Sequence, residues 1–129
     1  MMKRLICICA LVALLFSCGP RDEATKAVLV AKHSYEYLLK GKASSFVDAT
    51  YHESEIPESY REQLVLSAEM FVEHQDSLHG GIKEIEALKA VLYDEGNAAD
   101  AYLQFQYADG QSEQVLVPMV KHEDNWYLK

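Results

Sequence analysis

The sequence predicts an α+β domain in which helices come first and an antiparallel sheet follows. In the first half of the chain, apolar residues recur every three or four positions, as they do in amphipathic helices; in the second half they alternate with polar residues, as they do in strands. Asp109-Gly110, between two alternating runs, is typical of a hairpin turn. With 129 residues, the chain has room for one core of normal size. We expect three helices packed on four strands.

The three expected helices precede the double glycine at positions 80 and 81. The first covers residues 24–40 and ends before Gly41, a residue that favours the left-handed conformation at helix ends. A shorter helix is expected over 43–51. After a polar break, Pro57 suits the first turn of a third helix that runs to about residue 78. The residues of the third helix expected to face inward are Tyr60, Leu64, Ala68, Phe71 and Leu78.

Three strands follow from alternation, over residues 101–107, 115–119 and 126–128. Residues 82–93 are ambiguous, because they contain good helix formers but lie between the double glycine and a turn over 94–97. An antiparallel sheet needs a further strand, so we assign this segment as a strand, with a helix as the alternative. Pro118 cannot donate to a sheet ladder, so we expect it at an edge position or a bulge.

The amino terminus has the features of an export signal. Two basic residues precede an apolar run over residues 5–16, which is shorter than the roughly 20 residues that span a bilayer. Leu15-Phe16-Ser17-Cys18 resembles the lipobox of bacterial lipoproteins, in which cleavage leaves the cysteine first and diacylated. We therefore expect a signal peptide over 1–17, a lipidated Cys18 with a short tether over 18–23, and a domain over 24–129. The alternative is a plain secretory signal with a chance cysteine.

Charge and cysteine usage narrow the class of protein. Twelve Lys and Arg residues stand against 20 Asp and Glu residues, and this acidic excess argues against nucleic-acid binding. Cys7 and Cys9 would leave with the signal and lipid would consume Cys18, so no thiol would remain for catalysis or disulfides. Gly19 is not the aspartate that retains some lipoproteins in the inner membrane. We expect an exported protein, anchored in the outer membrane through Cys18 on its periplasmic or cell-surface face.

Besides the lipobox, four further stretches are similar to one known family: residues 37–41, 80–86, 104–110 and 125–128. With them, the whole chain resembles small lipobox-bearing lipoproteins of unknown function that have a cystatin-like, nuclear-transport-factor-two-like fold. The resemblance implies a curved sheet that wraps the helices as a cone, and it favours a strand over 82–93. Enzymes of this fold, such as ketosteroid isomerase, place a Tyr and an Asp or His in the cone, but the sequence contains no local motif of such an enzyme.

In the implied cone, inward-facing side chains could line a site for an apolar ligand. The alternative is that these side chains fill the core. No cofactor is expected. We expect no metal site either, because His74 and His79 are five residues apart, whereas helical zinc ligands are four apart. The candidate pocket residues are Tyr35, Met70 and Phe71 from the helices and Phe105, Tyr107, Met119 and Trp126 from the strands.

Two hypotheses for function follow. The first is a lipid-anchored binding or interaction module of the cell envelope, without catalysis, that contacts an envelope protein or forms a homodimer through the outer sheet face. The alternative is a small enzyme or a binder of small apolar or heteroaromatic molecules that uses the cone, which an open cavity with a carboxyl or His at its base would favour. Ser77 is a candidate O-glycosylation site, because Asp76-Ser77-Leu78 resembles a short sequon. The residues expected on the outer sheet face are Tyr102, Gln104, Gln106, Gln114 and Leu116.

Overall fold

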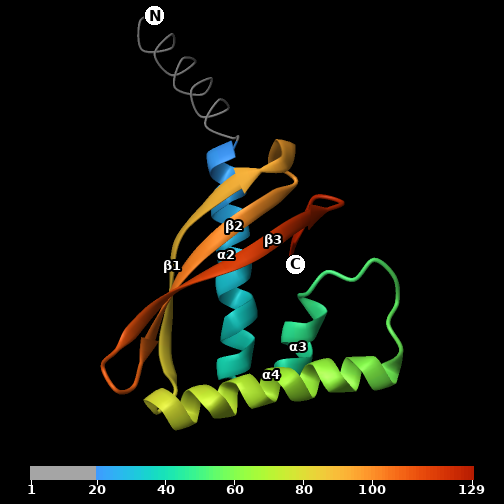
Figure 1. Ribbon diagram of the computed structural model, residues 1–129. Coiled ribbons are helices and arrows are strands. Elements are labelled where there is room, and N and C mark those ends of the chain that lie inside the picture. Colours follow the sequence, from blue (N-terminus) through green and yellow to red (C-terminus); the bar gives the residue numbers. More distant parts are fainter. Residues whose placement is uncertain (1–19) are drawn as a thin grey trace, which may run out of the picture.

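The computed structural model describes residues 20–129, so the expected signal peptide and Cys18 lie outside the described residues. Within these described residues, the order of elements confirms the predicted α+β class, with three helices before a four-stranded sheet (Figure 1). Residues 82–93, the ambiguous segment, form a strand. The elements are α2 (Pro20–Leu39), α3 (Ala43–Asp48), α4 (Glu58–His79), β1 (Ile82–Tyr93), the 3-10 turn η1 (Asp94–Gly96), β2 (Ala98–Tyr107), β3 (Ser112–His122) and β4 (Asn125–Leu128).

The sheet is an antiparallel meander in the order β1-β2-β3-β4. Pro118 lies opposite Asp100 of β2, and its carbonyl accepts a hydrogen bond from the backbone N–H of Lys129 on the other side. In a strand, the N–H and C=O groups of one residue point to the same side. The N–H that Pro118 lacks would therefore point toward Lys129, where β4 has already ended. This is the edge position that a proline in a strand requires.

The core lies between α2 and the inner face of the sheet. Small residues of α2, Ala27 and Ala31, are fully buried and let the helix approach the strands closely. On β2, buried residues alternate with half-buried ones along most of the strand, as predicted for a strand with one covered face. The largest fully buried side chains contributed by the sheet are Leu103, Phe105 and Met119.

The first helix begins at Pro20, four residues before the expected start. The helix therefore includes residues 20–23, which were expected to be part of the tether. Proline is favourable in a first helical turn, and the acidic residues Asp22 and Glu23 complement the helix dipole there. Glu23 also accepts a hydrogen bond from Trp126 Nε1 at 3.1 Å and pairs with Lys121 at 3.0 Å, which joins this turn to the sheet.

The second helix ends at Asp48, earlier than predicted, because the chain then pairs with the end of β4. The N–H of Tyr51 donates to the carbonyl of Leu128 at 2.7 Å, and the N–H of Leu128 donates to the carbonyl of Ala49 at 2.9 Å. Because of these two bonds, residues 49–51 pair with β4 and do not form a further helical turn.

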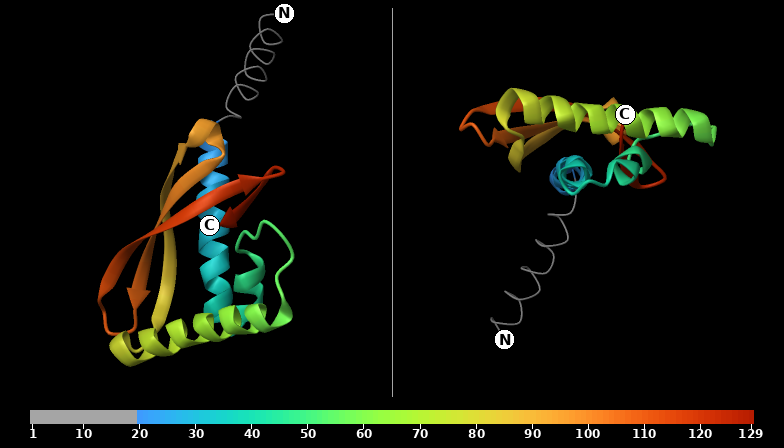
Figure 2. Two further views of the ribbon diagram at one scale, coloured as in Figure 1. Left: turned by 45° about the vertical axis from the view of Figure 1, so that its right-hand side comes forward. Right: turned by 90° about the horizontal axis from the view of Figure 1, so that it is seen from below.

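The third helix, α4, lies across one end of the molecule, at the opposite end from the start of α2 (Figures 1 and 2). It packs mainly on α3, and Ala68 is its one buried residue. Tyr60 and Leu78, predicted to face inward, are 48% and 58% exposed. The prediction fails at these positions because α4 crosses the end of the sheet instead of lying along its face. Within residues 20–129, no helix is long and apolar enough to cross a membrane.

Candidate functional site

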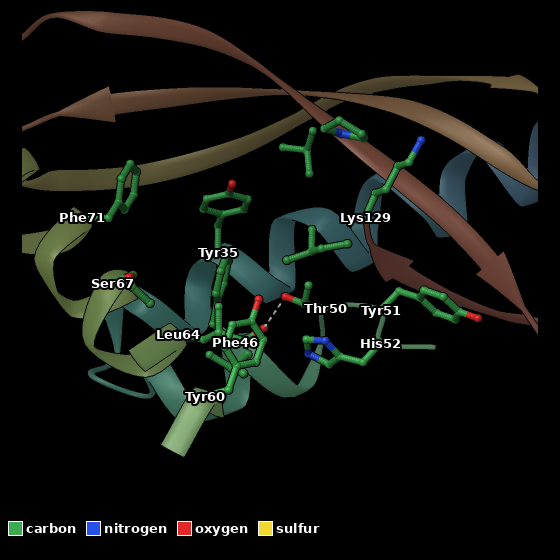
Figure 3. Close-up of a pocket in the computed structure, with 15 residues that line it drawn as sticks. Tyr35, Phe46, Thr50, Tyr51, His52, Tyr60, Leu64, Ser67, Phe71 and Lys129 are labelled. Carbon is green, nitrogen blue, oxygen red and sulfur yellow. Dashed lines mark hydrogen bonds between the residues drawn. The ribbon is translucent and has the colours of Figure 1, made fainter. Parts of the chain in front are cut away.

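A cavity of about 560 Å³ opens between α4, α3, the second half of α2 and the β3–β4 side of the sheet (Figure 3). This volume lies within the range of small-molecule sites, which runs from roughly 300 to 1,000 Å³. The site combines aromatic and aliphatic walls with a few polar groups. The lining residues are Tyr35, Phe46, Val47, Thr50, Tyr51, His52, Tyr60, Leu64, Ser67, Ala68, Phe71, Val117, Pro118, Leu128 and Lys129.

Tyr35 occupies the centre of the aromatic wall. Its ring packs edge to face on Phe46, with 5.1 Å between ring centroids, and on Phe71 at 6.3 Å. A tilted contact with Phe105 at 5.5 Å joins the same ring to the core. Burial raises the pKa of the Tyr35 hydroxyl, so this group stays protonated at neutral pH. The geometry therefore offers a rigid aromatic surface that also carries a hydrogen-bond donor.

His52 lies in the irregular segment between α3 and α4. Its Nε2 is buried and has no hydrogen-bond partner in the structure. A buried polar atom without a partner costs about 1–3 kcal/mol. The neighbouring hydroxyl of Thr50 is already used, since it donates to the carbonyl of Phe46 at 3.3 Å (Figure 3). His52 thus holds an unsatisfied nitrogen beside the cavity.

Lys129 is the one Lys, Arg, Asp or Glu residue among the described residues that line the cavity. It follows β4, and its side chain points toward the sheet, whereas Tyr60 comes from α4 on the opposite wall (Figure 3). Among residues 20–129, no group of three or more His, Cys, Asp or Glu side chains could hold a metal ion.

No protein-family model and no curated protein sequence matches this chain. A solved structure does match: a candidate NTF2-like transpeptidase from Campylobacter jejuni, with a TM-score of 0.54. The alignment covers 76% of this chain and 92% of that protein, at 14% sequence identity. Such a likeness shows the architecture alone. The chain has an NTF2-like fold. In this NTF2-like fold, the cavity lies where α3 and α4 meet the β3–β4 side of the sheet.

Two of the seven predicted pocket residues, Tyr35 and Phe71, line the cavity. Met70 does not line it, and its side chain is 58% exposed. Ala68 and Phe71 are three residues apart and turn to the same side of α4, which leaves Met70 on the outer side. The predicted residues that instead fill the core between α2 and the sheet are Phe105, Met119 and Trp126.

Tyr107 belongs to the same core, and at the far end of α4 it also forms a cluster with polar side chains. Its ring stacks on the His79 ring with 3.9 Å between centroids, and its hydroxyl donates to Glu113 at 3.1 Å. Burial, assisted by Glu113, raises the pKa of Tyr107 to about 12. His79 Nδ1 also lies 2.9 Å from a carboxylate oxygen of Asp109. This cluster joins the end of α4 to the β2–β3 hairpin, and it lines no part of the cavity.

Sequence reasoning missed several lining residues that flank the irregular segment over 49–57. Phe46 and Tyr60 lie on the two sides of this segment, and Tyr51 and His52 lie within it. The available signal was the grouping of aromatic residues around a segment that has no periodic pattern of its own. When apolar residues follow no repeating pattern, the sequence does not show which side chains share a face.

Proposed function

We propose that this protein is a lipid-anchored binding protein of the cell envelope, and that its cavity holds a small molecule with an apolar or aromatic body. The observation that carries the proposal is the open cavity of about 560 Å³ with the unpartnered His52 Nε2 beside it. A closed interior would have favoured a protein-interaction module instead. The aromatic wall around Tyr35 supports an aromatic ligand, because offset and edge-to-face ring contacts are favourable.

The residues that line the cavity favour a binding protein without catalytic activity. Acyl transfer, which the name of the Campylobacter jejuni protein implies for that protein, uses a nucleophile activated by a base within hydrogen-bond reach. In this chain Ser67 and His52 both line the cavity, but no hydrogen bond joins them in the described structure. The described lining residues also include no Asp or Glu that could act as a general base.

The anchor is part of the same proposal. The basic and apolar start of the chain and the lipobox ending at Cys18 support export and acylation, and Gly19 supports the outer membrane. The intact mass of the protein extracted from membranes is expected to equal the chain from Cys18 onward plus its acyl groups. An unprocessed chain, or one cut elsewhere and without lipid, would refute the anchor and leave the cavity unaffected.

Indole is a suitable first probe of the cavity, because it is a small aromatic molecule of the proposed class. At a hundred times its Kd, a ligand stabilises the folded state by about 2.7 kcal/mol, which raises Tm by several degrees in a domain of this size. We expect a concentration-dependent rise in Tm with indole. Ser67→Trp should abolish the rise, because Ser67 is exposed on the cavity wall and the larger side chain fills the space.

Ser59→Trp is the matched control, because Ser59 is exposed on the same helix and does not line the cavity. It should keep the rise in Tm. An equal loss of the rise in both variants, or no rise in the unmodified protein, would contradict binding in this cavity.

The outer sheet face remains a candidate surface for an envelope protein or a second copy of the chain. Leu116 is 48% exposed there, and its partner in the β2 ladder is Tyr102. Pairing through this face is compatible with the cavity, which lies on the helical side of the sheet.

A further inference from the structure

A second hollow, of about 550 Å³, adjoins the cavity. It is formed by the end of α3, the irregular segment after it and the first turns of α4, and Val47 and His52 line both hollows. In contrast to the aromatic cavity, the second hollow is bordered by carboxylates. Its acidic residues are Asp48, Glu53, Glu55 and Glu58.

The negative charge of this hollow is only partly balanced. Arg61 is the one Lys or Arg among its described lining residues, and it is already engaged: its guanidinium contacts Asp48 at 2.7 Å and the Ser44 hydroxyl at 2.8 Å. None of the ion pairs within residues 20–129 involves the other three carboxylates of the rim, Glu53, Glu55 and Glu58.

His52 connects the two environments. His52 lines both the aromatic cavity and the acidic hollow, and its buried Nε2 lacks a partner. A neutral imidazole nitrogen that carries no proton accepts a hydrogen bond from an N–H group. Exposed carboxylates alone would be an ordinary solvated rim. Here the carboxylates adjoin an aromatic cavity of ligand size and an unpartnered nitrogen. The carboxylates, the aromatic walls and the nitrogen would all suit a molecule that has an apolar body and a cationic N–H group.

We infer that the ligand of the cavity is an organic cation, with an aromatic or apolar body among the rings around Tyr35 and an ammonium group that extends past His52 toward the carboxylates. This inference rests on the proposed function and names its ligand class. The side chain of Lys129, the cation that lines the cavity, points toward the sheet and away from the His52 ring (Figure 3).

Three indole compounds isolate the effect of charge. Tryptamine is cationic, tryptophol is neutral and indole-3-propionate is anionic, while the ring and the short side chain are nearly the same. In calorimetric titrations of the purified protein, we expect tryptamine to bind about fivefold more tightly than tryptophol, as expected for exposed charge pairs. Indole-3-propionate should bind most weakly. The preference should shrink in 0.5 M NaCl, because salt screens exposed charges.

The triple variant Glu53→Gln, Glu55→Gln, Glu58→Gln removes the unbalanced carboxylates. In this variant the affinities for tryptamine and tryptophol are expected to become equal. The matched control is Glu62→Gln, Glu69→Gln, Glu73→Gln, which removes the same charge from exposed positions of α4 that do not line the hollow. The control should keep the full preference for tryptamine.

The outcomes separate this inference from the proposed function. Equal affinities for the three compounds, or tightest binding of indole-3-propionate, would overturn the organic cation and leave the cavity as a binding site. An equal loss of preference in both triple variants would also overturn it, because the effect would then come from net charge. Failure of all three compounds to bind would contradict the proposed function itself.

Discussion

Glu23 joins the first turn of α2 to the last two strands. Its carboxylate accepts a hydrogen bond from Trp126 Nε1 at 3.1 Å and lies 3.0 Å from the amino group of Lys121. The hydrogen bond with Lys121 is the main reason that the pKa of Glu23 is lowered; burial opposes this effect, and the bond from Trp126 adds to it. Residues about one hundred positions apart thus meet at one carboxylate.

This arrangement makes part of the stability depend on pH. The pKa of Glu23 is lower in the folded state than in the unfolded chain, so its contribution is present above the unfolded pKa and is lost as pH falls through the folded pKa. Glu23→Gln is expected to lower the free energy of unfolding by about 1 kcal/mol at neutral pH. In urea titrations, the difference from the unmodified protein should shrink as pH falls through the folded pKa of Glu23.

Glu86→Gln is the control for this prediction, because Glu86 is exposed on β1 and takes part in none of the ion pairs within residues 20–129. It should change stability little at any pH. A loss for Glu23→Gln that is constant with pH would mean that packing, and not the charge of the carboxylate, holds this turn to the sheet.

At the scale of single residues, helical periodicity predicted part of the site. Tyr35 and Phe71 lie on apolar helix faces, and both line the cavity. Spacing could not distinguish a core position from a cavity position, so Phe105 was predicted for the pocket although it is only 2% exposed within the core. His52 could not be placed at all, because its segment follows no repeating pattern.

At the scale of elements, α2 and α4 differ in how firmly they are held. The buried residues of α2 include Ala27, Ala31 and Leu38, whereas α4 buries Ala68 alone. Segments with few buried apolar contacts open at lower free energy than core elements. A weakly packed helix suits the wall of a cavity that must admit a ligand.

Hydrogen exchange tests this difference between the helices. We expect the amides in the middle of α4 to be roughly tenfold less protected than those in the middle of α2, because opening α4 exposes little apolar surface. Saturation with indole should raise the protection of α4 and leave α2 nearly unchanged. Equal protection of the two helices in the free protein would show that α4 opens only with the whole domain.

The sequence was informative about the type of each element and less so about its surroundings. The alternation over 101–107 predicted β2 correctly, since one covered face imposes a period of two. Tyr60 and Leu78 were misplaced, since an apolar position on a helix does not specify which element covers it. The packing of α4 on α3 is a long-range contact that no local pattern records.

At the scale of the molecule, the start of α2 and the cavity lie far apart. The 20 residues of α2 extend about 30 Å, and α4 lies at the opposite end from Pro20 (Figures 1 and 2). If Cys18 is acylated as proposed, only Gly19 separates it from this helix. The cavity would then face the aqueous space away from the membrane, which favours a water-soluble ligand such as an organic cation.

The central claim is that the cavity between α3, α4 and the sheet binds a small aromatic molecule. The most direct measurement is a titration of the isotopically labelled protein with indole, followed by NMR chemical shifts. We expect saturable shifts centred on Tyr35, His52 and Ser67, with little change at Leu116 on the outer sheet face. The absence of saturable shifts, or shifts confined to the outer face, would contradict the claim.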